Sequence, residues 1–126
     1  MAYYDSKGVL EDMDDIRKSY FDDDGTFLVM VDGEQIVGTG AIKKWDTEIC
    51  ELKRLWFLKE YRGKGLGYSM ILELFSFARN KGYQRVRLKT DPVAQSQAVN
   101  FYKRLGFHEI QPHAPQDDDI DMEMNL

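Results

Sequence analysis

A short glycine-rich segment, Arg62-Gly63-Lys64-Gly65-Leu66-Gly67, is the part of the sequence that points most directly to chemistry. It lies between a strand-like run over residues 48–58 and a helix-like run over residues 67–81. A glycine-rich turn that opens a helix presents unpaired backbone N–H groups at the positive end of the helix dipole, and such groups bind phosphate. Two basic side chains in the segment add positive charge. The segment therefore predicts a protein that holds a small molecule with a pyrophosphate group.

Three predicted strands lead up to this segment. They cover residues 26–31, 35–44 and 48–58. Asp32-Gly33 is a strong hairpin signal, and a second turn is expected near Asp46-Thr47, so the strands form an antiparallel meander. An amphipathic helix is predicted before them over residues 9–20, where four apolar residues recur at spacings of three and four.

Alternating helices and strands follow the segment. The helix over residues 67–81 is followed by Gly82, which suits a left-handed C-terminal cap. The later elements are a strand over 85–90, a helix over 96–105, and strands over 107–110 and 120–126. A strand–helix–strand unit implies a parallel pair joined by a right-handed crossover. The predicted fold class is thus α/β with a mixed sheet, in which an antiparallel meander is followed by β-α-β-α-β-β.

The composition fits one globular domain over residues 1–126. A net charge of −5 disfavours a nucleic-acid partner, which would favour a basic surface. No membrane partner is expected, because no apolar run could span a bilayer and the N-terminus lacks a signal-peptide pattern. Cys50 is the single cysteine, which favours a cytoplasmic location, and its apolar surroundings predict that it is buried. No Cys/His cluster has the spacing of a metal site.

Two longer motifs carry a family resemblance. The first is Glu51-Leu52-Lys53-Arg54-Leu55-Trp56-Phe57 followed by Tyr61 and the glycine segment, and the second is Asn100-Phe101-Tyr102-Lys103-Arg104-Leu105-Gly106-Phe107. Together with the strand order they resemble the GNAT N-acetyltransferase superfamily over residues 26–126. The resemblance implies a GNAT-like acyl-CoA N-acyltransferase fold and acetyl transfer from acetyl-CoA to a primary amine. Family members begin with a further strand and helix, so this chain is expected to be N-terminally short.

The glycine spacing supports CoA over other phosphate ligands. An ATP-binding P-loop needs Gly-x-x-x-x-Gly-Lys followed by Ser or Thr, whereas here Tyr68 and Ser69 follow Gly67. Glycines at 63, 65 and 67 also differ from the dinucleotide pattern Gly-x-Gly-x-x-Gly, which opens a doubly wound sheet rather than following a meander.

The resemblance implies which residues bind the cofactor. Backbone N–H groups from Arg62 through Gly63, Lys64, Gly65 and Leu66 to Gly67 would hold the pyrophosphate. The preceding strand would splay from its parallel neighbour, so that the backbone of Leu55, Trp56 and Phe57 binds the pantetheine arm like an added strand. One of these N–H groups would also stabilise the oxyanion that forms from the thioester carbonyl. Many members have Asn where Gln95 falls, so Gln95 would contact the cofactor arm.

Two residues are candidates for the proton transfers that aminolysis of a thioester requires. Tyr102 matches the family's tyrosine that faces the thioester sulfur. A phenol titrates at about 10 and a thiol at about 8.5, so Tyr102 could protonate the leaving thiolate; alternatively it is a core aromatic or only positions the sulfur. Glu51 is the candidate base, since some members have a carboxylate in this strand, and it could act through water. Alternatively, Glu51 is an ordinary strand carboxylate paired with a nearby cation.

Charged residues close to Glu51 bear on the acceptor. Adjacent strand residues point to opposite faces, so one of Lys53 and Arg54 either binds a carboxylate of an amino-acid-like substrate or forms a structural ion pair. His113 could touch the substrate, although exposure to solvent is its default interpretation. A sheet edge left uncovered by a missing first strand would invite another chain to pair, which fits a homodimer.

Three functions follow from these residues. The first is an acetyl-CoA-dependent N-acetyltransferase that acts, without a metal, on a primary amine of a small molecule by direct attack. The second is a catalytically weak acyl-CoA-binding module that regulates a partner, because the glycine segment suits both. The third is a nucleotide-binding protein, in which ATP or NAD would outcompete CoA. Tyr102 and Glu51 favour the enzyme.

Overall fold

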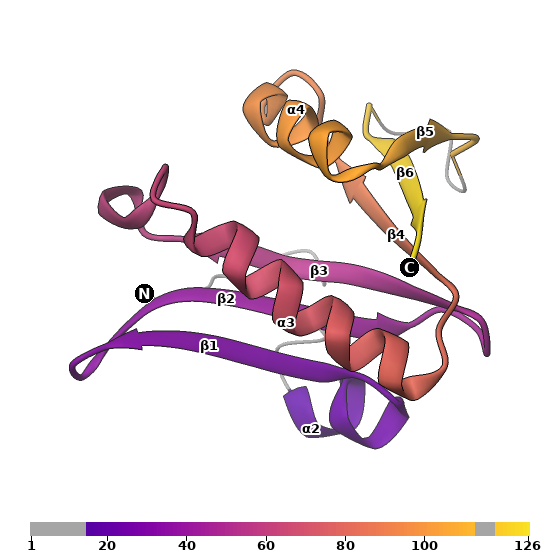
Figure 1. The fold of residues 1–126 in the computed structure, drawn as a ribbon, viewed down its shortest axis with the longest axis horizontal. Coiled ribbons are helices and arrows are strands. Elements are labelled where there is room, and N and C mark those ends of the chain that lie inside the picture. Colours follow the sequence, from indigo (N-terminus) through magenta and orange to yellow (C-terminus); the bar gives the residue numbers. More distant parts are fainter. Residues whose placement is uncertain (1–14, 113–117) are drawn as a thin grey trace.

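The computed structural model describes residues 15–112 and 118–126. Its centre is a six-stranded mixed sheet with the order β1-β2-β3-β4-β6-β5 (Figure 1). The strands are β1 (Thr26–Asp32), β2 (Gln35–Lys44), β3 (Ile49–Phe57), β4 (Arg85–Thr90), β5 (His108–Ile110) and β6 (Ile120–Asn125). The helices are α2 (Ile16–Ser19), α3 (Leu66–Lys81) and α4 (Ser96–Leu105), with 3-10 turns η1 (Phe21–Asp23) and η2 (Lys59–Tyr61). The mixed α/β fold with its β-α-β-α-β-β series is confirmed.

The first three strands form the expected antiparallel meander. β2 has the predicted bounds, and β1 and β3 differ from prediction by single residues at their ends. The first hairpin turns one residue later than expected, at Gly33-Glu34, because Asp32 still pairs with Gln35. Asp46 fixes the second turn, since its carboxylate accepts two backbone N–H hydrogen bonds of 2.8 Å at the start of β3.

α3 and α4 bury their apolar side chains in one core. α3 crosses the face of β1, β2 and β3 (Figure 1) and buries Met70, Ile71, Leu74, Phe75 and Ala78. The helix comes so close to β2 that a Cβ added at Gly40 would lie 2.8 Å from a methyl group of Leu74. α4 adds the buried Val99 to the same core. Gly82 ends α3 in the left-handed conformation, as predicted.

Strand alternation separates this core from a charged face on the other side of the sheet. Cys50 of β3 and Val86 of β4 lie opposite each other in the core, and Leu88 of β4 pairs with the buried Met122 of β6. The side chains between them point the other way. The charged face therefore includes one row of residues that lie opposite one another on β2, β3, β4 and β6: Lys43, Glu51, Arg87 and Glu123.

β3 and β4 separate soon after they meet. They are paired in parallel at only three positions, from Ile49 opposite Arg85 to Glu51 opposite Arg87. Beyond these positions β3 remains paired with β2, and β4 remains paired with β6. Figure 1 shows the two strands diverging from this shared end. The expected splay of the parallel pair is confirmed, and Glu51 lies at its vertex.

Part of the predicted N-terminal helix lies outside the described residues. Within them, α2 covers only Ile16–Ser19 and the 3-10 turn η1 follows directly. Tyr20, between the two, is fully buried and packs edge-on against Phe27 of β1. His113, a candidate for contact with the substrate, also lies outside the described residues.

Candidate functional site

The glycine segment forms an open turn directly before α3. Gly65 is the N-cap residue with a φ of 81°, a left-handed conformation that costs glycine little. The first hydrogen bond of the helix is from the N–H of Ser69 to the carbonyl of Gly65, at 3.1 Å. Within the described part of the chain, no hydrogen bond is donated by the backbone amides of residues 63–68. These amides are arranged as an anion site requires.

Space is open next to this turn. A Cβ added at Gly63 or Gly65 would meet no atom of the chain within 4 Å. Two contacts link the same turn to the β1–β2 hairpin. The hydroxyl of Tyr61 donates a hydrogen bond to the carboxylate of Asp32, at the end of β1. The Nζ of Lys64 lies 5.6 Å from the centre of the Tyr61 ring. That hydrogen bond raises the pKa of Tyr61. A ligand can therefore approach amides that are held by the β1–β2 hairpin.

Arg62 is used differently from the other residues of the segment. Its backbone N–H donates to the carbonyl of Lys59, at 3.2 Å, and its Nε donates to the carbonyl of Phe57, at 2.8 Å. Its amide thus belongs to the η2 turn rather than to the group of unpaired amides, and its side chain links the end of β3 to the segment. The predicted phosphate contact of the Arg62 amide is therefore not favoured by this geometry.

β3 contains a bulge that the sequence did not reveal. Thr39 lies opposite Trp56 and Ala41 lies opposite Lys53, so Arg54 and Leu55 share the place opposite Gly40. Arg54 has a φ of 57°, which is unfavourable for a residue with a side chain, and its carbonyl accepts a 2.6 Å hydrogen bond from the hydroxyl of Thr39. A simple alternation of Lys53 and Arg54 between the two faces therefore does not hold here.

The bulge sets which backbone groups of β3 face the gap toward β4. The N–H of Leu58 donates to Val37 of β2, at 2.9 Å, so Trp56, two residues earlier, also directs its backbone toward β2. Leu55 and Phe57 then direct theirs to the opposite edge, where β4 has already diverged. Of the three predicted residues, Leu55 and Phe57 are placed to pair with an extended ligand, although Arg62 already uses the Phe57 carbonyl.

Tyr102 lies on α4, on the core side of the sheet. Its ring packs against Phe101, with centroids 5.8 Å apart, and edge-on against Phe107, at 5.7 Å. Burial raises the pKa of its phenol. Tyr102 therefore keeps its proton at neutral pH, as a proton donor must. Its ring also packs in the core, as the alternative interpretation of this residue expects.

Glu51 lies at the vertex of the gap, on the charged face. Lys43 of β2 and Arg87 of β4 lie opposite it on its two sides. The Nε of Arg87 donates a hydrogen bond to the carboxylate of Glu123. The guanidinium of Arg87 also lies 5.5 Å from the centre of the Trp45 ring. Burial alone would raise the pKa of Glu123, but the hydrogen bond and charge of Arg87, together with Arg85, hold it below its ordinary value. The Arg87–Glu123 pair could not be predicted from the sequence, because it depends on the strand order that places β4 beside β6.

Gln95 begins α4 and stabilises the end of β4. Its side-chain oxygen accepts hydrogen bonds from the hydroxyl of Thr90, at 2.7 Å, and from the N–H of Asp91, at 3.4 Å. The carbonyl end of the side chain is thus engaged within the protein. Only its amide NH₂ group remains suited to the predicted contact with a cofactor arm.

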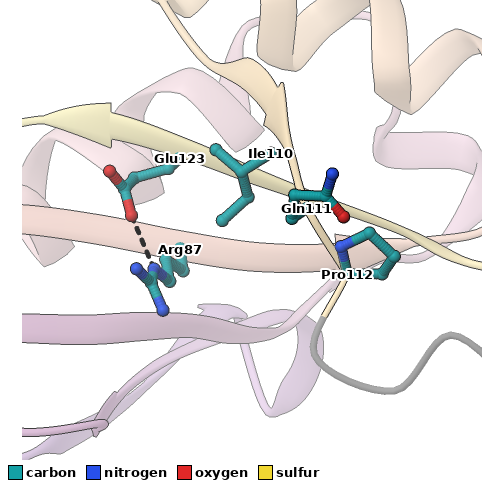
Figure 2. A pocket seen from close by; sticks show the side chains of 5 residues that line it. All are labelled: Arg87, Ile110, Gln111, Pro112 and Glu123. Atoms are coloured by element: carbon teal, nitrogen blue, oxygen red, sulfur yellow. Dashed lines mark hydrogen bonds and ion pairs between the residues drawn. The ribbon is translucent and has the colours of Figure 1, made fainter.

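A pocket of about 370 Å³ opens on the charged face. It is lined by Arg87, Ile110, Gln111, Pro112 and Glu123 (Figure 2). Figure 2 shows the Arg87–Glu123 pair on one side and Gln111 and Pro112 on the other. Because Arg87 lies opposite Glu51, this pocket adjoins the vertex of the β3–β4 gap.

Other candidate chemistry finds little support among the described residues. They contain no group of three or more His, Cys, Asp or Glu side chains that could hold a metal ion. Cys50 is fully buried, as predicted, and burial raises the pKa of its thiol to about 12, so it is not a nucleophile. No helix in residues 15–112 or 118–126 has the length and apolar character that crossing a membrane requires.

Comparisons with known proteins agree with this geometry. The model of the Acetyltransferase (GNAT) family matches residues 2–107. Among curated relatives, N-acetyltransferase 8 of Rattus norvegicus is 39% identical over 110 residues, which cover 82% of this chain and 49% of the relative. The chain spans about half the length of the mammalian relatives that it matches.

Solved structures show the same architecture. An acetyltransferase of the GNAT family from Staphylococcus aureus Mu50 has a TM-score of 0.85 and 25% identity, covering 95% of this chain and 79% of that one. The PaiA N-acetyltransferase from Thermoplasma acidophilum, solved in complex with coenzyme A, has a TM-score of 0.75 and 25% identity, covering 88% of this chain and 66% of that one.

Proposed function

This chain belongs to the GNAT family of acetyltransferases, and we propose that it transfers the acetyl group of acetyl-CoA to a primary amine of a small molecule. The observation that carries the proposal is the combination of two features along one strand. β3 separates from β4 after Glu51, and the chain then continues into a glycine turn with unpaired amides at the start of α3. A gap that could admit an extended chain thus leads to a site that could hold its phosphates.

The residues present fit acetyl-CoA. The amides of residues 63–68 would bind its pyrophosphate, with Lys64 adding charge. The backbone of Leu55 and Phe57 would bind its pantetheine arm in the gap, as an added strand binds a sheet edge. Bound there, acetyl-CoA supplies an acetyl group already activated as a thioester.

The chain's own residues would then handle two protons. Glu51, at the vertex, would accept the proton that the attacking amine loses, directly or through water. Tyr102, on the other side of the sheet, would donate its phenolic proton to the sulfur when the carbon–sulfur bond breaks. The new bond joins the amine nitrogen to the acetyl carbon, and the proton taken up by Glu51 balances the one given by Tyr102. No metal is needed for this transfer.

The charged face suggests how the acceptor enters. The pocket that adjoins the vertex lies on this face, away from α3. Arg87 lines it, and Lys53, two residues after Glu51, lies on the same face. Arg87 is already paired with Glu123, so Lys53 is the cation that would suit an amino-acid-like acceptor with a carboxylate next to its amine.

The edge of the sheet at β1 would suit a homodimer. Within the described residues, β1 pairs with β2 only. Three aliphatic side chains near the hairpin tip are about half exposed, namely Val29, Val31 and Ile36. An open edge strand with exposed aliphatic side chains is prone to pair with a second copy.

A panel of primary amines tests the proposed function. The chain of residues 1–126 is incubated with acetyl-CoA and each amine, and free thiol release is measured. Turnover with at least one small amine, faster for those with a carboxylate, is expected. CoA binding without turnover across the panel would instead support a regulatory module, and preference for ATP or NAD over CoA in thermal-shift assays would contradict the cofactor assignment.

The Glu51→Gln variant tests the proposed base. It removes the proton acceptor while preserving side-chain size, so kcat is expected to fall about 100-fold. The KM for acetyl-CoA should change little, because Glu51 lies at the vertex rather than beside residues 63–68. Wild-type kcat in Glu51→Gln would show that another group accepts the proton.

A further inference from the structure

The charged face contains three ionisable side chains in register on three neighbouring strands. Glu51 of β3 lies opposite Arg87 of β4, and Arg87 lies opposite Glu123 of β6. All three project from the face that lies away from α3 and α4, because their sequence neighbours are in the core. Charges on this face thus alternate from negative to positive to negative, beginning at the vertex of the β3–β4 gap.

Arg87 is fixed from two directions. Its Nε donates to one carboxylate oxygen of Glu123, and Arg85 donates to the other, at 3.2 Å. The Trp45 ring lies against the guanidinium, at 5.5 Å from its centre. The Arg87 side chain is only 19% exposed and that of Glu123 only 10%, so solvent screens their charges weakly.

We infer that Arg87 is a positioning residue for Glu51 and that Glu123 is the residue that holds Arg87 in place. This inference rests on the proposed role of Glu51 as the base. A fixed positive charge beside Glu51 favours its ionised form, so the carboxylate remains able to accept a proton at lower pH. Glu123 acts through Arg87 and touches no reacting atom.

Other charges also face Glu51 and must be held constant in a test. Lys43 lies opposite it on β2, and Lys53 is two residues along its own strand. Arg85 and Lys89 are two residues away from Arg87 on β4, and Asp121 is two residues from Glu123 on β6. None of these is altered in the variants below, so differences between variants report on the Arg87–Glu123 pair.

The pH dependence of kcat/KM separates this role from a purely structural one. The acidic limb of the kcat/KM profile is where activity is lost as Glu51 becomes protonated. Arg87→Met removes the cation, so this limb should move to higher pH by about half a unit to one unit. Glu123→Gln keeps Arg87 charged and removes an anion, so the limb should stay in place or move slightly lower. Arg87→Lys keeps the charge, so its limb should stay within about 0.3 units of wild type. A merely structural role would lower activity in all three variants and leave the acidic limb of Arg87→Met at its wild-type pH.

Direct titration of Glu51 provides a readout independent of turnover. The carboxyl carbons of glutamate are labelled with ¹³C, and Glu51 is assigned by the loss of its signal in Glu51→Gln. Arg87→Met should raise the Glu51 midpoint relative to wild type. Lys81→Met, which removes a lysine paired with Asp24 at the far end of α3, is the matched control and should leave it unchanged.

The possible outcomes distinguish this inference from the proposed function. If Glu51→Gln is inactive and Arg87→Met leaves both the limb and the Glu51 midpoint unchanged, the positioning role is wrong and the proposed base stands. If Glu51→Gln retains wild-type kcat, the proposed base is wrong, whatever Arg87 does to the Glu51 midpoint. Should Arg87→Met fail to fold, Arg87→Gln removes the same charge and gives the same comparison, and an unmoved Glu51 midpoint in Arg87→Gln would overturn the inference.

Discussion

Tyr102 combines a packing role with the chemistry proposed for it. Its ring contacts Phe101 and Phe107 in the core, which the sequence could suggest from the apolar helix around it. Burial raises its pKa, so the phenol stays protonated across the physiological range. The two interpretations of this residue are therefore compatible, because the same packing that buries the ring also preserves the proton.

Tyr102→Phe tests the donor role without disturbing this packing. The variant keeps the ring and loses only the hydroxyl, so its melting temperature should stay close to wild type. The turnover number should fall about 100-fold, as is usual when a general acid is removed. Steady-state kinetics at neutral pH would check this, and unchanged kcat would mean that the leaving thiolate takes its proton from elsewhere.

Glu123 should make the protein's stability depend on pH. Its pKa in the folded protein is lowered from an ordinary value of 4.5, so it contributes stability above that value and loses the contribution as the pH falls through its folded value. Glu123→Gln should be less stable than wild type at pH 7, by about 1–2 kcal/mol, because two arginines lose a charged partner.

Denaturant unfolding between pH 2 and pH 7 would measure this effect. The difference in the free energy of unfolding between wild type and Glu123→Gln should shrink as the pH falls below 4.5 and Glu123 takes up a proton. A difference that stayed constant across this range would mean that the ionised carboxylate is not what stabilises the folded chain.

α3 is the element that presents the proposed phosphate site, and its two ends offer a matched pair of glycines. Gly65 begins the helix with a φ of 81°, and Gly82 ends it with a φ of 94°. A Cβ at either position meets nothing within 4 Å, so Ala at either site introduces the same kind of backbone strain, about 1–2 kcal/mol. Only Gly65 lies among the unpaired amides.

Gly65→Ala should therefore weaken cofactor binding, whereas Gly82→Ala should not. Both variants should lose similar stability, and the Gly65→Ala variant should in addition raise the dissociation constant for CoA about fivefold or more. Isothermal titration calorimetry with CoA would measure the dissociation constant of each variant. Equal affinities in the two variants would show that the turn at residues 63–68 does not contact the cofactor.

Most elements could be predicted from local sequence patterns. Turn residues and alternation sufficed to give β2, β4 and α4 their observed bounds. The β3 bulge could not be predicted, because Arg54 has no intrinsic preference for a positive φ and the bulge depends on the hydrogen bond from Thr39, fifteen residues away. Similarly, the Arg87–Glu123 pair required β6 to insert between β4 and β5, an order that no local pattern specifies.

At the scale of the whole molecule, the sheet has two halves that meet at three residue pairs. β1, β2 and β3 form one half under α3, and β4, β6 and β5 form the other with α4 beside them (Figure 1). The proposed acetyl-CoA site lies where the halves part, with the glycine turn from one half and Tyr102 from the other. Such a site depends on the position of both halves at once, which explains why its residues are far apart in the sequence.

Assembly can be tested at the β1 edge of the first half, where β1 has β2 as its one neighbour among the described strands. Val31→Lys places a charge among the exposed aliphatic side chains at the β1 edge. Light scattering after gel filtration should show a dimer for wild type and a monomer for the variant, with a melting temperature within a few degrees of wild type because Val31 is exposed. A wild-type monomer at all concentrations tested would contradict the homodimer.

The central claim is that residues 63–68 hold the pyrophosphate of acetyl-CoA and that its arm extends along Leu55 and Phe57 toward Glu51. A crystal structure of the chain with bound CoA tests it most directly. We predict phosphate oxygens within hydrogen-bonding distance of the amides of residues 63–68 and a pantetheine arm between β3 and β4. Density for CoA elsewhere on the molecule, with that gap filled by side chains, would contradict the account.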